Sequence, residues 1–144
     1  CTGGMLSSRL VDVPGASEIF KSGYVTYSNK AKKKLVGVKK SSLDKYGAVS
    51  EVVAKEMAKG AALFSKADVT VAITGIAGPD GGTEEKPVGL VYIACQVCGT
   101  MTVKEYHFKG NRTKIRESSV ASALGLMREC ILKYSSDILF GQKQ

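Results

Sequence analysis

A nearly continuous apolar run that leads straight into a glycine-rich segment constrains the fold of this chain more than any other feature. Residues 68–73 form the run, and its pattern is typical of a strand buried on both faces. The segment TGIAGPDGGTEEKPVG follows, and a second glycine pair stands in the opening letters CTGG. Glycine and hydroxyl residues at strand ends let backbone N–H groups approach a phosphate closely, but Gly-Pro-Asp-Gly-Gly is equally typical of a surface turn. The pattern therefore favours either a small-anion site or an ordinary turn.

Three further stretches are predicted to be strands. Residues 88–97 and 101–108 predict a hairpin around Gly99, and residues 23–27 alternate in polarity and are β-branched. Together with the helices described next, these strands indicate one layered α/β domain.

Helices are predicted in four places: residues 4–10, Ser28 or Asn29 to about residue 36, a stretch after Ser50, and a long stretch after Asn111. Helical spacing places one set of apolar residues on the buried face of the helix after Ser50: Val53, Met57, Gly60, Ala61 and Phe64. The same spacing gives the long final helix its buried stripe: Val120, Ala123, Leu124, Met127, Ile131 and Tyr134. We expect that helix to fray near Ser135.

Composition narrows the class of protein. A length of 144 residues with 44% apolar content predicts one domain with a real core. No run of 18 apolar residues occurs, so no membrane span is expected. The net charge of +8 comes from lysines spread along the chain, without Trp or aromatic-basic interleaving, so nucleic acid is not the expected partner.

Cysteine and histidine usage points to a reduced protein without a metal. Four cysteines are few for a disulfide scaffold, and Cys95 and Cys98 lie in an apolar stretch without a second pair. We read them as buried reduced thiols of a cytoplasmic protein. The single histidine, His107, has no Cys/His cluster around it, so we expect a structural role for it and no transition-metal site. The reaction that the resemblance described below implies needs no cofactor.

One lysine stands out in the helix that follows Ser28. At 100° per residue, Ala31, Leu35 and Val36 mark the helix's buried side. Lys32 projects between Leu35 and Val36, whereas the helix's other lysines project toward the opposite face. Desolvation can lower a lysine pKa by as much as about 3–5 units, whereas the helix dipole contributes well under about one unit. Lys32 is therefore the candidate for a neutral lysine base. The alternative is that its side chain snorkels to solvent and stays charged.

A lysine base needs a group to activate. Tyr27 precedes Lys32 by five residues, and Ser17 follows a Pro-Gly turn where a helix N-cap would stand. A serine nucleophile, a lysine base and a tyrosine proton relay could together perform acyl chemistry. Arg112 and Arg116 share one face in the first turns of the final helix, where cations oppose the helix dipole. That placement favours either an anion held between them or two solvated arginines.

Five segments, in this order along the chain, resemble the CinA C-terminal domain family, the nicotinamide-nucleotide amidohydrolases: CTGG, DVPGASEIF, GYVTYSNKAKKKLVGV, GAVS and TGIAGPDGGTEEKPVG. The resemblance runs essentially from Cys1 to the final helix. It implies a single layered α/β/α domain with a mixed sheet over residues 1–144. The family's opening helix and strand, which precede the Cys-Thr-Gly-Gly, are expected to be missing from it.

The resemblance also implies an activity. The family reaction hydrolyses the carboxamide of nicotinamide mononucleotide to nicotinate mononucleotide and ammonia in pyridine nucleotide salvage. Ser17, Tyr27 and Lys32 match the catalytic residues. A larger set matches the substrate-binding positions: Thr2, Gly3, Gly4, Asn29, Thr74, Gly75 and one of Arg112 and Arg116. The resemblance further implies a homodimer or larger homo-oligomer. A non-catalytic nucleotide-binding module that partners competence or DNA-repair proteins is the alternative, as is an amidase for a related small anionic amide.

Overall fold

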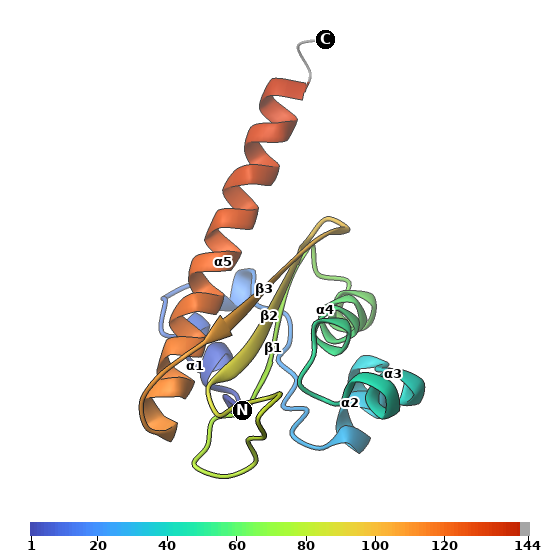
Figure 1. Cartoon of the computed structure of the whole chain (residues 1–144). Helices are drawn as coiled ribbons and strands as arrows, with labels where there is room; N and C mark the ends of the chain where they lie inside the picture. Colours follow the sequence, from blue (N-terminus) through green and yellow to red (C-terminus); the bar gives the residue numbers. More distant parts are fainter. Residues whose placement is uncertain (142–144) are drawn as a thin grey trace.

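A computed structural model gives the fold of the chain and describes residues 1–141. The elements run in this order: α1 (Met5–Val11), the 3₁₀ helix η1 (Ala16–Glu18), α2 (Asn29–Val36), α3 (Lys40–Tyr46), α4 (Glu51–Ser65), β1 (Val69–Gly75), β2 (Leu90–Val97), β3 (Thr100–His107) and α5 (Arg112–Gly141). Figure 1 shows a central sheet with α2, α3 and α4 on one side and α1 and α5 on the other. The layered α/β architecture is therefore confirmed.

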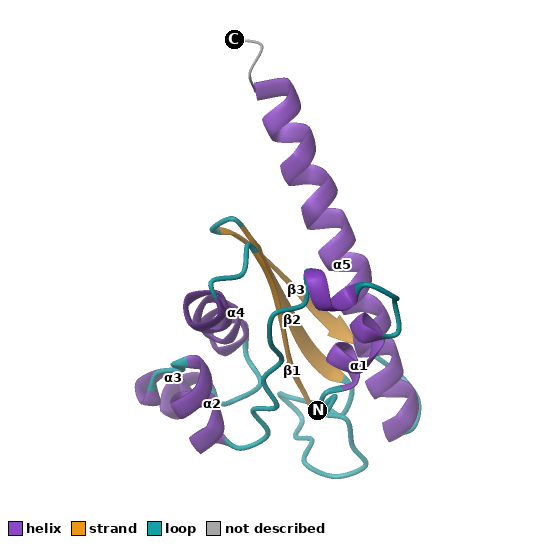
Figure 2. Cartoon of the chain, turned by 180° about the vertical axis from the view of Figure 1, so that it is seen from behind, coloured by secondary structure: helices purple, strands orange, loops and turns teal. Residues whose placement is uncertain are grey.

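The sheet has the order β1-β2-β3, and alternation along its strands builds a core on each face. Ala72 and Ala94 are paired across β1 and β2 and pack toward α4. Ile93 and Cys95 point the other way and pack with Ile115 of α5. Figure 2 shows from behind how the two helical layers enclose the strands.

Both strand pairings are antiparallel, so the mixed sheet expected from the resemblance is not seen among the described residues. Residues 23–27 are not a strand either. Their alternation reflects other contacts, because Gly23 lies so close to α1 that a Cβ there would collide with Ser7, and the Thr26 carbonyl binds a lysine side chain. The segment therefore lies beside β1 across a cavity, without forming a ladder with it.

The helix starts that the sequence predicts are confirmed. Ser28 accepts a hydrogen bond from the Ala31 N–H, Ser50 from the Val53 N–H and Asn111 from the Lys114 N–H. Five details differ from expectation. Ser17 lies inside η1, and α5 continues past Ser135 to Gly141. Three apolar side chains that were predicted to be buried are exposed: Leu35 (40%), Phe64 (55%) and Ile131 (36%).

The helix α3 has no strong sequence signal, because Leu43 is the one large apolar side chain before its final Tyr46. Its N-terminus is fixed from outside by the Glu56 carboxylate of α4. That carboxylate accepts hydrogen bonds from the Lys39 N–H at 2.9 Å and from the Ser42 hydroxyl at 2.7 Å. A long-range cap of this kind cannot be read from the local sequence.

The cysteines differ in part from the prediction of buried reduced thiols. All four are free, but Cys95 is buried and Cys98 is exposed on the hairpin turn. The pKa of the Cys95 thiol is raised to about 12 by burial and by its contact with Cys130 of α5. None of the helices in residues 1–141 has the length and apolar character that crossing a membrane requires.

Candidate functional site

Most of the candidate residues line one cavity at the end of β1. The cavity has a volume of about 340 Å³, within the range of about 300–1,000 Å³ typical of small-molecule sites. It extends from this end along the outer edge of β1, opposite residues 19–27. The fold brings the following candidates together around it: Thr2, Gly3, Gly4, Tyr27, Asn29, Lys32, Thr74 and Gly75.

Lys32 is buried, as the helical spacing predicts. Its side chain lies on the α2 face that also holds the buried Val36, and the residue is 7% exposed. The ammonium nitrogen donates a hydrogen bond to the Thr26 carbonyl at 2.8 Å. Burial lowers the pKa of Lys32 below its ordinary value, because desolvation penalises the charged form. The alternative of a snorkelling, solvated lysine is therefore not what the structure shows.

Tyr27 and Arg112 meet although they lie far apart in the sequence. The Arg112 guanidinium donates to the Tyr27 phenol oxygen at 2.9 Å and to the Gly78 carbonyl at 2.7 Å. The Arg112 side chain thus connects the start of α5 with the glycine-rich segment and with the residues before α2. The phenol oxygen accepts this bond, so its own proton remains free to be donated toward a ligand.

Arg116 holds the first glycine loop. Its guanidinium donates to the Cys1 carbonyl and to the Thr2 carbonyl, both at 3.1 Å. Gly3 and Gly4 follow with φ values of +59° and +93°, in the left-handed region that favours glycine. The two arginines therefore position the loops of the site through backbone carbonyls, and each guanidinium keeps further N–H donors.

The charges at this end of the cavity are of one sign. Lys32, Arg112 and Arg116 all lie near Cys1 at this end of the cavity. Three cations gathered at one place attract an anion. The site is thus suited to a small anionic group.

The strand end and the glycine-rich segment are fixed by close packing. The buried Thr74 hydroxyl donates to the Ala48 carbonyl at 2.8 Å. A Cβ at Gly75 would collide with Val91, so the strand can end here only with glycine. Lys86 reaches from the glycine-rich segment to the Val49 carbonyl at 2.8 Å and closes the segment over the start of α4.

Ser17 is not part of this arrangement. It is exposed on η1 and does not line the cavity. Figures 1 and 2 both show η1 on the α5 side of the sheet, whereas α2 with Lys32 lies on the α4 side. Its role as nucleophile stays a prediction from the resemblance.

The sequence did not predict four groups that hold the site together. They are three backbone carbonyls that accept hydrogen bonds, those of Thr26, Ala48 and Gly78, and the Lys86 side chain. Only the Thr26 contact could have been predicted from the local sequence, because Thr26 precedes Lys32 by six residues at the start of α2.

These features define a class: a small layered α/β domain with a cavity along one edge of its sheet, a buried lysine in the cavity wall and two arginines that hold the adjacent loops. A protein family with this class of fold also matches this chain in sequence. Residues 1–131 match the CinA C-terminal domain. The chain therefore belongs to the CinA C-terminal domain family.

Relatives and solved structures agree with this assignment. A competence-damage inducible protein of Clostridium kluyveri is 54% identical over 132 residues, which cover 92% of this chain and 32% of that protein. The chain thus spans about a third of the length of the curated relatives it matches.

Among solved structures, the competence/damage inducible protein CihA of Agrobacterium tumefaciens has a TM-score of 0.88 and 42% identity, covering 90% of this chain and 79% of that one. A CinA superfamily protein of Escherichia coli has a TM-score of 0.84 and 40% identity, covering 87% of this chain and 73% of that one.

Proposed function

We propose that this domain is an amidohydrolase that removes ammonia from nicotinamide mononucleotide and leaves nicotinate mononucleotide. The observation that carries the proposal is the buried Lys32 in the wall of a basic cavity that also holds Tyr27 and the glycine loops. Burial lowers the pKa of Lys32, so at a given pH more of this lysine is in the neutral form that a general base needs than of an ordinary surface lysine. The direct test is ammonia release from nicotinamide mononucleotide by the purified protein.

The ligand charges fit the same end of the cavity. The nucleotide phosphate would lie near Arg112 and Arg116, where free guanidinium N–H groups and the backbone of Gly3 and Gly4 can donate to it. The pyridinium ring would then lie toward Lys32 and Tyr27. Its positive charge withdraws electrons from the carboxamide and makes the carbonyl carbon easier to attack.

The proposed mechanism uses the lysine first as base and then as acid. Neutral Lys32 takes the proton of the nucleophile, directly or through Tyr27, and the nucleophile attacks the carboxamide carbon. Backbone N–H groups of the glycine-rich loops stabilise the negative oxygen of the tetrahedral intermediate. The proton then passes from Lys32 or Tyr27 to the departing ammonia. With Ser17 as nucleophile, water finally hydrolyses the acyl-enzyme.

Replacing Ser17 by alanine separates the nucleophile from the base. The resemblance predicts that the Ser17→Ala variant binds nicotinamide mononucleotide normally and loses turnover, because no acyl-enzyme can form without the hydroxyl. Calorimetric binding and ammonia release on the same preparation measure the two properties. Near-normal turnover would reassign the attack to a water molecule activated by Lys32, the group that the structure places in the cavity.

Replacing Arg112 by alanine tests the phosphate site. We expect KM for nicotinamide mononucleotide to rise roughly 10- to 100-fold, because a charge-assisted contact contributes about 1.5–3 kcal/mol. The matched substrate is nicotinamide riboside, which lacks the phosphate and whose KM should change much less. Arg128→Ala, at an exposed position of α5, is the control variant. An equal rise in KM for both substrates would show that Arg112 acts through Tyr27 and Gly78 and not on the phosphate.

A further inference from the structure

The charge of this chain is concentrated in one small lobe. Residues 30–45, which form α2 and α3 and the connection between them, contain seven lysines and one aspartate, a net charge of +6 out of +8 for the whole chain. One of the seven, Lys32, is buried in the candidate site. The other six have exposed side chains: Lys30, Lys33, Lys34, Lys39, Lys40 and Lys45.

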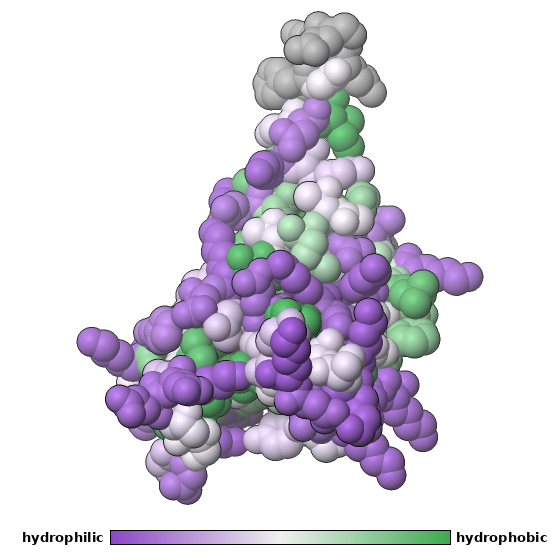
Figure 3. Space-filling model, turned by 45° about the vertical axis from the view of Figure 1, so that its right-hand side comes forward, coloured by the Kyte–Doolittle hydropathy of each residue, from purple (hydrophilic) through white to green (hydrophobic). Residues whose placement is uncertain are grey.

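These six lysines all lie on two adjacent helices and the connection between them. Both helices pack on α4, and Figures 1 and 2 show them side by side at the outer end of that layer. Figure 3, which brings this side of the molecule forward, shows many hydrophilic side chains over its lower part, with some hydrophobic ones between them. The six exposed lysines of residues 30–45 thus lie on neighbouring elements at one end of the molecule.

Few acidic groups oppose this charge. Asp44 pairs with Lys40 at 2.6 Å, and the Glu56 carboxylate of α4 is engaged with the Lys39 N–H and the Ser42 hydroxyl. The remaining exposed lysines of the lobe form no salt bridge within residues 1–141. A surface of this kind attracts a polyanion strongly.

We propose that the α2–α3 lobe binds the phosphate backbone of nucleic acid without reading its sequence. Lysine ammonium groups are point charges suited to phosphate, and the lobe presents no arginine and no aromatic platform beyond Tyr46 for contacts to bases. A membrane-binding helix would need several large apolar side chains beside the lysines. On the lobe, Leu35 and Tyr46 are the large apolar residues exposed, each at 40%. The proposal departs from the expectation that nucleic acid is not the partner, which rested on the spread of lysines over the whole chain and on the lack of Trp and of aromatic-basic interleaving.

The lobe lies next to the candidate site but uses different residues. Lys32 faces the cavity, whereas the six exposed lysines lie on the lobe's outer surface. Backbone binding therefore does not depend on the proposed deamidation, and either one can be tested when the other fails.

Fluorescence anisotropy with a labelled DNA duplex of arbitrary sequence tests the proposal. We expect binding whose logarithm falls linearly with the logarithm of salt concentration, with a slope of about −0.9 for each phosphate neutralised. The triple variant Lys33→Glu, Lys34→Glu, Lys45→Glu should bind at least roughly 10-fold more weakly and lose about 2.7 of the slope. A shuffled duplex should bind as well as the original one.

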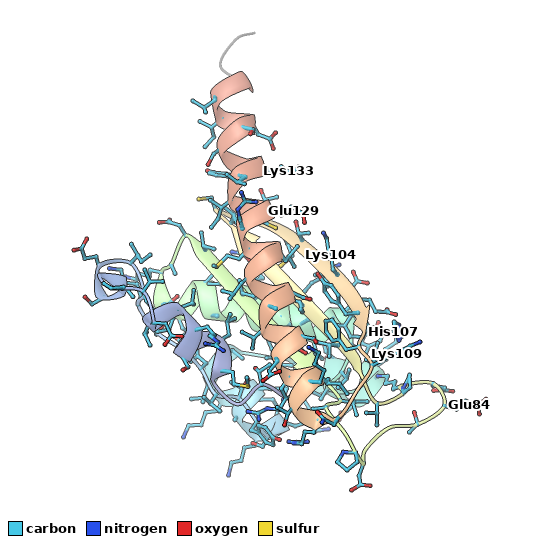
Figure 4. All side chains as sticks on the ribbon, turned by 90° about the vertical axis from the view of Figure 1, so that its left-hand side faces the viewer. Glu84, Lys104, His107, Lys109, Glu129 and Lys133 are labelled. Atoms are coloured by element: carbon cyan, nitrogen blue, oxygen red, sulfur yellow. The ribbon has the colours of Figure 1, made fainter. Side chains whose placement is uncertain are left out.

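A second triple variant serves as the control, because it changes the net charge by the same amount outside the α2–α3 lobe. Lys109→Glu, Arg128→Glu and Lys133→Glu are exposed substitutions after β3 and on α5, and Figure 4 labels Lys109 and Lys133 on that side of the molecule. We expect this triple variant to bind DNA within about 3-fold of the wild type, since local charge, not net charge, determines backbone contacts. Equal losses in the two triple variants would overturn the proposal.

Two further measurements are needed. The first shows whether a variant binds weakly because phosphate contacts are lost or because it is unfolded. The second shows whether the lobe binds DNA or a lipid surface. Circular dichroism and thermal melting check that the lobe variant is folded, and the alanine version of the same triple substitution should lose affinity to a smaller extent. Binding to phosphatidylserine vesicles that depends on the lobe, with no binding to DNA in about 50 mM salt, would assign the surface to a membrane and overturn the proposal.

Discussion

Lys32→Met should release ammonia from nicotinamide mononucleotide about 10²- to 10⁴-fold more slowly than the wild type. The reason is that a positioned general base typically contributes that factor, and methionine fills the same space without a basic nitrogen. The fold should survive, because the substitution removes a buried amine whose charged form is disfavoured and leaves only the Thr26 carbonyl without its donor. Steady-state kinetics together with a thermal melting curve measure both effects.

Two control variants show whether the loss of turnover in Lys32→Met comes from the loss of proton transfer. Lys32→Arg keeps a positive charge that cannot be lost near neutral pH, so it should be as inactive as Lys32→Met. Lys34→Met changes an exposed lysine of the same helix and should leave turnover within about 2-fold. Wild-type turnover in Lys32→Arg would show that the site needs a charge there and not a base.

Gly60→Ala should strongly destabilise the protein. A Cβ at Gly60 would collide with the backbone carbonyl of Val36, at the point where α2 crosses α4. The helices would have to separate, at a cost of about 2–3 kcal/mol, which lowers the melting temperature by roughly 6–12 °C for a domain of this size. Because Val36 and Lys32 share one face of α2, the shift should also reduce turnover.

Gly125→Ala is the matched control in α5. A Cβ at Gly125 has nothing within 4 Å. Alanine should therefore stabilise the protein by about 0.5–1 kcal/mol through its higher helix propensity. Calorimetry of the two variants should give shifts of opposite sign. Shifts of the same sign would contradict the close approach of α2 and α4 that holds Lys32 in place.

The sequence predicts the elements whose signals are local. Helices that begin at Ser28, Ser50 and Asn111, and the hairpin around Gly99, carry their own capping and turn residues. The failures have non-local causes. Residues 23–27 have strand-like alternation because they contact α1 and Lys32, and α3 is stabilised by a carboxylate from α4.

The residues of the candidate site also differ in whether the local sequence predicts their position. Helical periodicity predicts the burial of Lys32, since the phase of α2 is fixed by Val36. It cannot predict that Arg112 meets Tyr27, because the two residues come from opposite faces of the sheet and are joined only by the fold. It also cannot place Ser17, whose position depends on how the segment after α1 leads into η1. The resemblance groups Ser17 with Lys32, and the described structure leaves them apart.

The pH dependence of kcat/KM for ammonia release from nicotinamide mononucleotide tests the central claim most directly. Burial lowers the pKa of Lys32, so the neutral base becomes available as pH rises through this lowered value, below the ordinary lysine value of 10.5. We therefore expect a limb that rises with pH toward a plateau and that is absent in Lys32→Met. An active enzyme with a flat profile, or with the same rising limb in both proteins, would contradict Lys32 as the base. A folded wild type that binds the nucleotide and releases no ammonia would contradict the proposed reaction.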